Sequence, residues 1–378
     1  MDIIYFIVWA ALLQGFIQAL IYIFAKKHRS VANTLLGLFL LTFLLMAFAA
    51  IPPFDHIGSY NFAEYFAIPH VILFTPVLFF HFVLEKLGNS YKYQLFLKAN
   101  YLIALSISLI TLLNLYLFVF ESSSIVQAFE LSSVKWVHFS LNLYSFLIAV
   151  CVIFISWREI RQFKTLVQNE FSDYNLLQVN WLFNLIYLLL PVIVLWGVAL
   201  FRVVWITGFS PDFDFPIFGL IAVFLYYLSY QAYLHPNLFE RLPESILKKK
   251  EKELNTGSVD EKRNKETGKL IERLMTENEY YLDHDLTISA FAKEVGVSPR
   301  KISTIINQDF RKNFNEWVND FRVKKARELL ESDAENKYSV EGIGMESGFK
   351  SRSALYAAFK NKLGRSPGEL RSSKLSKR

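Results

Sequence analysis

Two segments near the C-terminal end carry polar side chains whose chemistry and helical spacing suit the edges of nucleic acid bases. In the first segment, four of them recur at i, i+3, i+4 and i+7, on one face of a helix: Arg300, Ser303, Thr304 and Asn307. In the second segment, three recur every four residues: Arg352, Tyr356 and Lys360. Arginine forks onto guanine, asparagine pairs with adenine, and serine or threonine bonds to either. Each segment therefore predicts a helix that reads bases in the major groove of DNA, the alternative being a merely solvated polar face.

The charge around these segments favours DNA over that alternative. Residues 350–378 contain nine lysines and arginines but one acidic residue, Glu369. Such a stretch attracts phosphates, because neutralising them releases condensed counterions. Two neighbours of the reading residues complete the predicted DNA-binding set: Arg300, Lys301, Ser303, Thr304, Asn307, Arg352, Ser353, Tyr356 and Lys360.

A repeat predicts the elements that position these side chains. Ala292 and Gly296 recur 52 residues later as Gly344 and Gly348. Gly296 and Gly348 are each followed within three residues by a serine. A small residue late in one helix allows close packing, a glycine four residues later supplies a left-handed turn, and the serine caps the next helix. The sequence thus predicts a helix, a sharp turn and a second helix, twice over.

One long helix is predicted between the two copies. Its apolar residues follow helical spacing: Phe314, Trp317, Val318, Phe321, Ala326, Leu329 and Leu330. A stiff helix here would hold the two reading helices one DNA turn apart, about 34 Å, so that one chain reads a split half-site.

Three stretches carry a family resemblance: Leu286–Ala292 (LTISAFA), Phe321–Leu330 (FRVKKARELL) and Ser347–Pro367 (SGFKSRSALYAAFKNKLGRSP). Over about residues 268–372 the chain closely resembles the AraC/XylS family of bacterial transcription regulators. The resemblance implies an all-α, homeodomain-like module of two helix-turn-helix units that binds specific promoter DNA. By position, it also implies the base-reading residues, which are Arg300, Ser303 and Thr304 in the first unit and Arg352, Ser353 and Tyr356 in the second.

The chain departs from the family pattern at two glycines. Gly342 stands where an acidic or polar residue is expected, and Gly344 stands where alanine is expected. Each glycine inside a helix costs roughly 0.5–1 kcal/mol. The departure predicts a loose first helix in the second unit and a weaker or more conditional DNA contact there.

The N-terminal part has a different chemistry. Of the whole chain, 53% is apolar and the net charge is +6, and residues 1–234 contain equal numbers of cationic and acidic side chains. Seven apolar runs are long enough to cross a membrane, which needs about 20 residues: Ile3–Ala25, Ala32–Ile51, Tyr65–Leu84, Asn100–Phe120, Trp136–Trp157, Val179–Trp205 and Ile217–Leu234. We therefore expect an all-α chain with an N-terminal bundle of seven transmembrane helices, in preference to seven core helices of a soluble protein.

The distribution of cations predicts the orientation of this bundle. Nine lysines and arginines lie in alternate connections between the runs, and two lie on the opposite side. Cations favour the cytoplasmic side, which places the N-terminus outside and the C-terminal part in the cytoplasm. Toward the outer side, His70, His138 and Arg202 would line a signal pocket, because polar groups in lipid are costly. The alternative is that such residues hydrogen-bond between helices or reach the interface.

These observations divide the chain into a membrane domain (1–235), a charged cytoplasmic linker (236–267) and a tandem helix-turn-helix domain (268–378). They predict a multi-pass regulator in the bacterial cytoplasmic membrane. The predicted partners are double-stranded promoter DNA, membrane lipid, an unidentified signal ligand, RNA polymerase and a second copy of the chain. The rival hypothesis is a membrane transporter or channel with a regulatory cytoplasmic domain.

An enzyme is the third and weakest reading. The sequence has no glycine-rich phosphate loop, no H-E-x-x-H, no nucleophile elbow and no kinase-type histidine segment followed by an ATP-binding pattern. With one cysteine, Cys151, neither an intrachain disulfide nor a cysteine-based zinc site is expected. We therefore expect neither catalysis nor a cofactor.

Overall fold

The computed structural model describes residues 2–25, 30–50, 56–57, 60–61, 69–121, 131–170, 180–205, 214–234, 262–332 and 338–375. The chain divides into two compact units. The first comprises Met1–Ile160 and Trp181–Lys252, and the second comprises Arg161–Asn180 and Glu253–Arg378. Much of the expected linker, 236–267, lies outside the described residues, and its last part belongs to a helix that begins at Lys262. The expected domain boundaries stay predictions.

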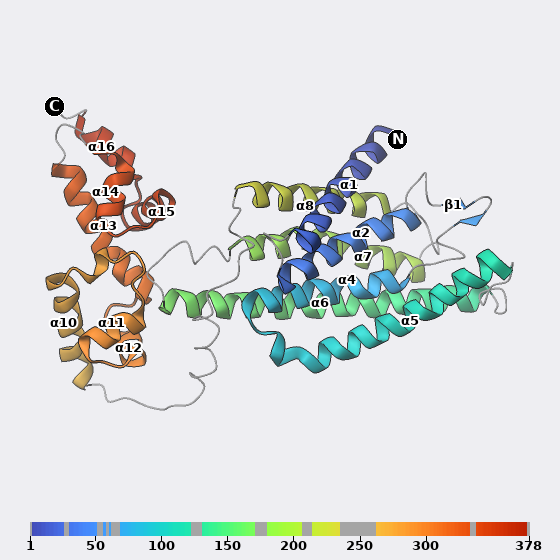
Figure 1. Ribbon diagram of the computed structural model, residues 1–378, viewed down its shortest axis with the longest axis horizontal. Helices are drawn as coiled ribbons and strands as arrows, with labels where there is room; N and C mark the ends of the chain where they lie inside the picture. Colours follow the sequence, from blue (N-terminus) through green and yellow to red (C-terminus); the bar gives the residue numbers. More distant parts are fainter. Residues whose placement is uncertain are drawn as a thin grey trace. The chain divides into compact units, whose positions relative to one another are not determined.

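In its described residues the first unit is helical apart from one small hairpin (Figure 1). Its elements are α1 (Asp2–Phe24), α2 (Val31–Ala50), β1 (His56–Ile57), β2 (Tyr60–Asn61), α4 (Pro69–Leu87), η2 (Ser90–Tyr93), α5 (Gln94–Glu121), α6 (Leu131–Glu170) up to Ile160, α7 (Asn180–Trp205) from Trp181 and α8 (Asp214–Leu234). β1 and β2 pair antiparallel, with His56 opposite Asn61, and this hairpin was not predicted. Helix α2 packs against α1 and α4, α4 packs against α5, and α1 packs against α8.

Five described helices are long and apolar enough to cross a membrane: Tyr5–Phe24, Val31–Phe48, Ser90–Asn114, Trp136–Asn169 and Asn180–Arg202. The prediction of seven crossings is therefore confirmed in part. The third expected run lies on α4, and its first residues, 65–68, fall outside the described part of the chain. The apolar stretch of α8, Pro216–Gln231, is shorter than the other five.

Helix α6 is longer than its apolar run. It continues past the expected end at Trp157 to Glu170, for 40 residues in all. The charged residues after Trp157 were expected to form a connection, but Arg158, Glu159 and Arg161 are good helix formers and continue the helix. At 1.5 Å per residue, α6 is about 60 Å long, roughly twice the hydrocarbon thickness of a bilayer.

Large apolar side chains on the outside of these helices match a lipid environment. Leu102 and Leu109 on α5 are 65% and 58% exposed, and Phe154 on α6 is 66% exposed. A soluble protein rarely leaves such extended apolar faces open to water. The N-terminal part therefore has the apolar helices and the apolar surface of a membrane domain.

Polar side chains inside the first unit connect helices to one another. Ser229 Oγ donates to Gln18 Oε1 (3.0 Å), which joins α8 to α1. Asn184 Nδ2 donates to the hydroxyl of Tyr227 (2.8 Å), which joins α7 to α8. Glu159 on α6 is 4% exposed and accepts hydrogen bonds from Asn89 and Tyr93. For these residues the structure supports hydrogen bonding between elements.

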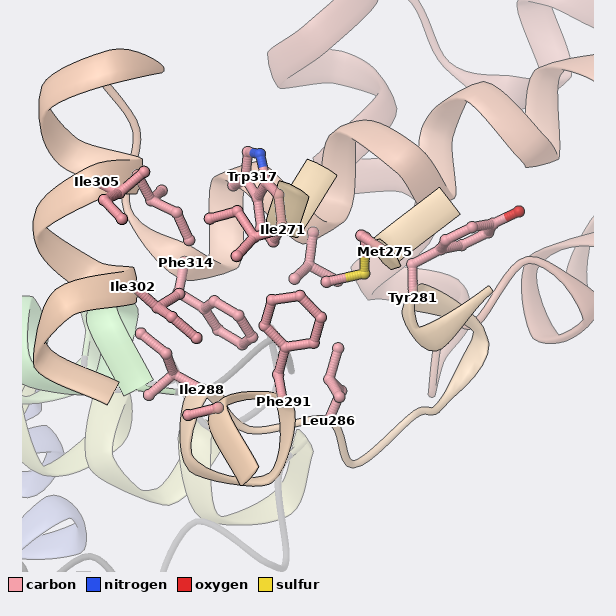
Figure 2. Close-up of a cluster of buried hydrophobic side chains, with 13 residues drawn as sticks. Ile271, Met275, Tyr281, Leu286, Ile288, Phe291, Ile302, Ile305, Phe314 and Trp317 are labelled. Carbon is pink, nitrogen blue, oxygen red and sulfur yellow. The ribbon is translucent and has the colours of Figure 1, made fainter. Parts of the chain in front are cut away.

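The second unit contains α10 (Lys262–Glu277), η7 (Tyr280–Leu282), α11 (Ile288–Val295), α12 (Pro299–Asp309), α13 (Phe314–Ser332), α14 (Val340–Glu346), α15 (Arg352–Leu363) and α16 (Pro367–Leu375). Its apolar side chains form two clusters, one at the N-terminal half of α13 and one at its C-terminal half. The first gathers Phe291, Ile302 and Trp317 with residues of α10 (Figure 2). The second gathers Ala326, Leu355 and Phe359. Helix α13 contributes to both clusters, which confirms the predicted connecting helix.

Candidate nucleic-acid interface

The first helix-turn-helix is formed by helix caps and a glycine turn, which are local features of the sequence. Thr287 caps α11 by accepting a hydrogen bond from the backbone of Ala290 (3.1 Å). Gly296 ends that helix with a φ of 68°, in the left-handed region that suits glycine. Ser298 then caps α12, and Pro299 occupies the first helical position. The predicted glycine turn and serine cap are confirmed here, and the cap at Thr287 was not predicted.

The second helix-turn-helix repeats this arrangement with one added residue. Ser339 caps α14, Gly348 turns the chain with a φ of 89°, and Ser351 caps α15 by accepting from the backbone of Ala354 (3.2 Å). One residue lies between the glycine and the capping serine in the first helix-turn-helix, and two lie between them in the second. The added position is Lys350, so the capping serines Ser298 and Ser351 are 53 residues apart, whereas the glycines are 52 apart.

Packing explains one of the two departures from the family pattern. Gly344 is buried on α14, and a β-carbon there would lie 2.9 Å from Cδ2 of Leu355 on α15. Glycine at residue 344 therefore lets the two helices approach closely. The predicted looseness of α14 remains a prediction.

Helix α12 presents a mixed face of exposed and half-buried polar groups. Arg300 and Asn307 are exposed, whereas Lys301, Ser303 and Thr304 are half-buried. Asn307 Nδ2 lies 3.4 Å from Ser303 Oγ and donates to it, so two of the predicted reading residues are in contact before any ligand binds.

Helix α15 presents the second face. Arg352, Ser353 and Lys360 are exposed, and Tyr356 is half-buried. The guanidinium of Arg352 lies 5.1 Å from the centre of the Tyr356 ring and donates to its hydroxyl (3.3 Å). Stacking on the ring restricts the arginine, so its fork of donors is already oriented. The Ser353 hydroxyl lies 2.9 Å from that of the capping Ser351.

A buried arginine joins the two helix-turn-helix units. Arg322 on α13 is 2% exposed, and its Nε and Nη2 donate to the backbone carbonyls of Tyr281 (2.7 Å) and Asp283 (2.6 Å). Sequence reasoning missed this residue. The signal was present, because Val318, Arg322 and Ala326 share one apolar helical stripe, where an arginine must be buried and must find acceptors.

Ion pairs on the surface add to this connection. Lys350 Nζ lies 2.8 Å from Asp285 Oδ1, so the residue added to the second turn contacts the segment that leads into the first helix-turn-helix. Glu279 accepts from Lys325 on α13 (3.1 Å) and from the hydroxyl of Tyr281 (3.2 Å). The hydrogen bond from Lys325, helped by that from Tyr281, lowers the pKa of Glu279 below its ordinary value of 4.5. The same hydrogen bond with Glu279 raises the pKa of Lys325.

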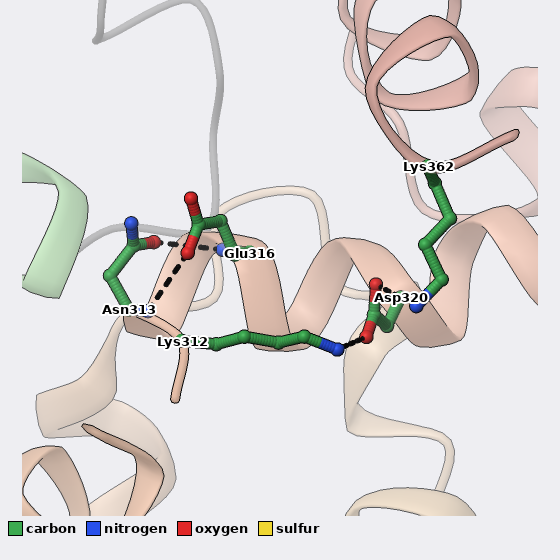
Figure 3. A network of polar contacts seen from close by, with 5 residues as sticks. All are labelled: Lys312, Asn313, Glu316, Asp320 and Lys362. Atoms are coloured by element: carbon green, nitrogen blue, oxygen red, sulfur yellow. Dashed lines mark hydrogen bonds and ion pairs between the residues drawn. The ribbon is translucent and has the colours of Figure 1, made fainter. Parts of the chain in front are cut away.

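One carboxylate on α13 pairs with a lysine from each helix-turn-helix unit (Figure 3). Asp320 accepts from Lys312, which follows α12, and lies 2.5 Å from Nζ of Lys362, in the last turn of α15. Partial burial lowers the pKa of Lys312, but the hydrogen bond and charge of Asp320 outweigh that effect and the pKa is raised. Nearby, Asn313 and Glu316 exchange hydrogen bonds that cap the start of α13.

The three residues predicted for a signal pocket lie on three different helices. His70 is the second residue of α4, and its side chain lies outside the described part. His138 lies in α6 and its backbone carbonyl accepts from Asn142 (3.0 Å). Arg202 is half-buried in the last turn of α7. The pocket stays a prediction.

Comparison with known proteins supports the nature of the C-terminal part. Residues 291–373 match the family model for a helix-turn-helix domain. A relative from Formosa agariphila named histidine kinase P4 is 28% identical over 117 residues, which are 31% of this chain and 8% of that protein. No solved structure matches the chain. The C-terminal part of this chain is thus a helix-turn-helix domain of the AraC type, and it follows an N-terminal part with several apolar helices.

Proposed function

We propose that this protein is a membrane-integral transcription regulator whose C-terminal domain binds a specific promoter sequence. The observation that carries the proposal is the pair of reading helices in the C-terminal domain. Two capped reading helices, α12 and α15, each present arginine, serine and further polar side chains, and both pack against the single helix α13. Arginine and asparagine at such positions suit guanine and adenine in the major groove.

The proposed DNA-binding residues are Arg300, Lys301, Ser303, Thr304, Asn307, Arg352, Ser353, Tyr356 and Lys360. The pre-oriented guanidinium of Arg352 is the strongest candidate for a base contact, because a stacked arginine loses little freedom on binding. Exposed Lys360, one turn after Tyr356, is suited to a phosphate.

The N-terminal helices would hold the regulator in the membrane with seven crossings and the N-terminus outside. The exposed apolar faces of α5 and α6 and the predominance of cations in alternate connections support this topology. A signal at or outside the membrane would act by favouring one arrangement of the C-terminal domains, for example of two copies of the chain. The relative's histidine kinase activity is not proposed for this chain.

The test uses the full chain in lipid nanodiscs and a random library of double-stranded DNA. We expect selection to enrich two sequence blocks about one helical turn apart, with binding that weakens steeply as salt rises. The comparison is the Arg300→Ala, Arg352→Ala double variant, in which both replaced side chains are exposed. Its selected sequence should lose preference at two positions, one in each block. If the wild-type chain enriched no sequence, or the double variant enriched the same one, the proposed function would be wrong.

A further inference from the structure

Helix α13 makes polar connections to the rest of the domain on two sides. On one side, Arg322 donates to the carbonyls of Tyr281 and Asp283. On another side, Asp320 pairs with Lys312 and Lys362. Residues two apart on an α-helix leave it in directions about 160° apart, because each residue turns the helix by about 100°. The two connections therefore lie on nearly opposite sides of α13.

Each lysine of the Asp320 pair is attached to the end of a reading helix. Lys362 is the penultimate residue of α15. The backbone N–H of Lys312 donates to the carbonyl of Ile306 in α12 (3.4 Å), so Lys312 moves with that helix. Arg311, just before it, has a φ of 53° in the left-handed region, which turns the chain from α12 toward α13. Asp320 consequently forms ion pairs with lysines at the C-terminal ends of both reading helices.

We infer that Asp320 is a positioning residue that sets the separation and angle of the two reading helices, and hence the spacing of the two DNA blocks that the chain accepts. This inference rests on the proposed function. The hydrogen bonds of Arg322 hold η7 and the residue after it to α13, so they do not set the tilt of α15. The Asp320 pairs close the opposite side, where the carboxylate is 24% exposed and each lysine is less than half exposed.

The role concerns geometry more than stability. Partly exposed ion pairs contribute little to folding, because solvent screens them and ordering the side chains costs entropy. Two pairs that share one carboxylate can still restrict an angle. They also keep two cations occupied that lie beside the reading helices and that would otherwise be available to phosphates.

The experiment compares Asp320→Asn with Glu331→Gln in the full chain in nanodiscs. Glu331 is the matched control, because it pairs with Arg327 (2.6 Å), four residues before it on the same helix α13. Each variant is titrated with the selected DNA and with versions in which the two blocks are one or two base pairs closer or farther apart. Non-specific binding to a scrambled duplex is measured across a range of salt concentrations.

For the wild type and Glu331→Gln we expect a change of one base pair in spacing to weaken binding by about tenfold, the scale of one lost base contact. For Asp320→Asn we expect a loss of about threefold or less, again judged against that scale. We also expect tighter non-specific binding, with a salt slope steeper by up to about two, because Lys312 and Lys362 are released. A generally damaged domain would instead bind every duplex more weakly.

Two further results keep the inference separate from the proposed function. If the wild type bound no preferred sequence, the proposed function would be overturned and this inference with it. If the wild type bound and Asp320→Asn kept the same spacing profile and salt slope, the inference alone would be overturned. Should hydrogen exchange show that Asp320→Asn is unfolded, Lys362→Gln replaces it, with the same relaxed spacing expected and the same unchanged profile counting against us.

Discussion

The backbone of Gly348 lies directly against the carbonyl group of Tyr281. A β-carbon at residue 348 would collide with that oxygen and would lie 2.9 Å from Cα of Leu282. The same carbonyl accepts the hydrogen bond from Arg322 Nε. The turn of the second helix-turn-helix therefore rests on η7 of the first, and this contact leaves no room for a side chain.

Gly348→Ala should destabilise the second helix-turn-helix unit by at least about 2 kcal/mol. Alanine is strained at a φ of 89°, and its methyl group meets backbone atoms that cannot move aside. The measurement is hydrogen exchange of α13 and α15 in the full chain. Gly364→Ala is the control, since its φ is 68° but nothing lies within 4 Å of the new carbon. It should cost about 1 kcal/mol, the strain alone. Equal effects at both sites would contradict the close contact.

Arg322→Lys should destabilise the same helix-turn-helix unit by about 2 kcal/mol, because one ammonium cannot serve the two backbone carbonyls in the way that the guanidinium fork does. Protection of η7 and α14 from exchange should fall first. The comparison variant is Arg327→Lys, an exposed residue paired with Glu331 on the same helix, which should change stability by less than about 0.5 kcal/mol. A tolerated Arg322→Lys would mean that the two carbonyls do not depend on this side chain.

Replacing reading residues should separate base contacts from phosphate contacts. Arg300→Ala and Arg352→Ala should each relax preference at one position of the selected DNA by about 1–3 kcal/mol. Lys360→Ala should weaken all sequences alike and reduce the salt slope by about one. Binding to a panel of single-base variants at two salt concentrations distinguishes the two patterns, and identical behaviour of the three variants would refute this assignment.

The stability of the second unit should decline in acid in a way that depends on Glu279. Its pKa in the folded chain is lowered, first by the hydrogen bond from Lys325. A lowered folded-state pKa means that the contribution is complete above the ordinary value of 4.5 and is lost as the pH falls through the lower folded value. Urea unfolding between pH 6 and about pH 3.5 should show a shallower decline for Glu279→Gln than for the wild type. Glu272→Gln, on the exposed side of α10, should decline as the wild type does.

Thiol labelling should test the proposed topology. In a Cys151→Ser background, cysteines at Ser123 and Ser210 should react with a membrane-impermeant maleimide added from outside. A cysteine at Ser172 should react after the membrane is permeabilised, because it follows the end of α6, whose cations Arg158, Arg161 and Lys164 favour the cytoplasmic side. The reverse pattern would invert the orientation and would place the DNA-binding domain outside the cell.

The sequence predicted the parts of the fold that depend on residues within a turn or two of chain. Both serine caps, both glycine turns and the apolar spacing of α13 lie where they were expected. In the membrane part its prediction of seven crossings is confirmed in part, because five of the described helices are long and apolar enough to cross a membrane. It also ended α6 too early, because charge marks the end of an apolar run and not the end of a helix.

By itself, then, the sequence determined the two helix-turn-helix units and their polar faces, because caps, turns and amphipathic spacing are local properties of the chain. The tertiary structure decided how those units are held together. Arg322 bonds to a carbonyl 41 residues away, and Lys350 pairs with an aspartate 65 residues away. Asp320 receives lysines from both units. Such contacts depend on how helices pack in three dimensions, and no short-range pattern of residues encodes that packing.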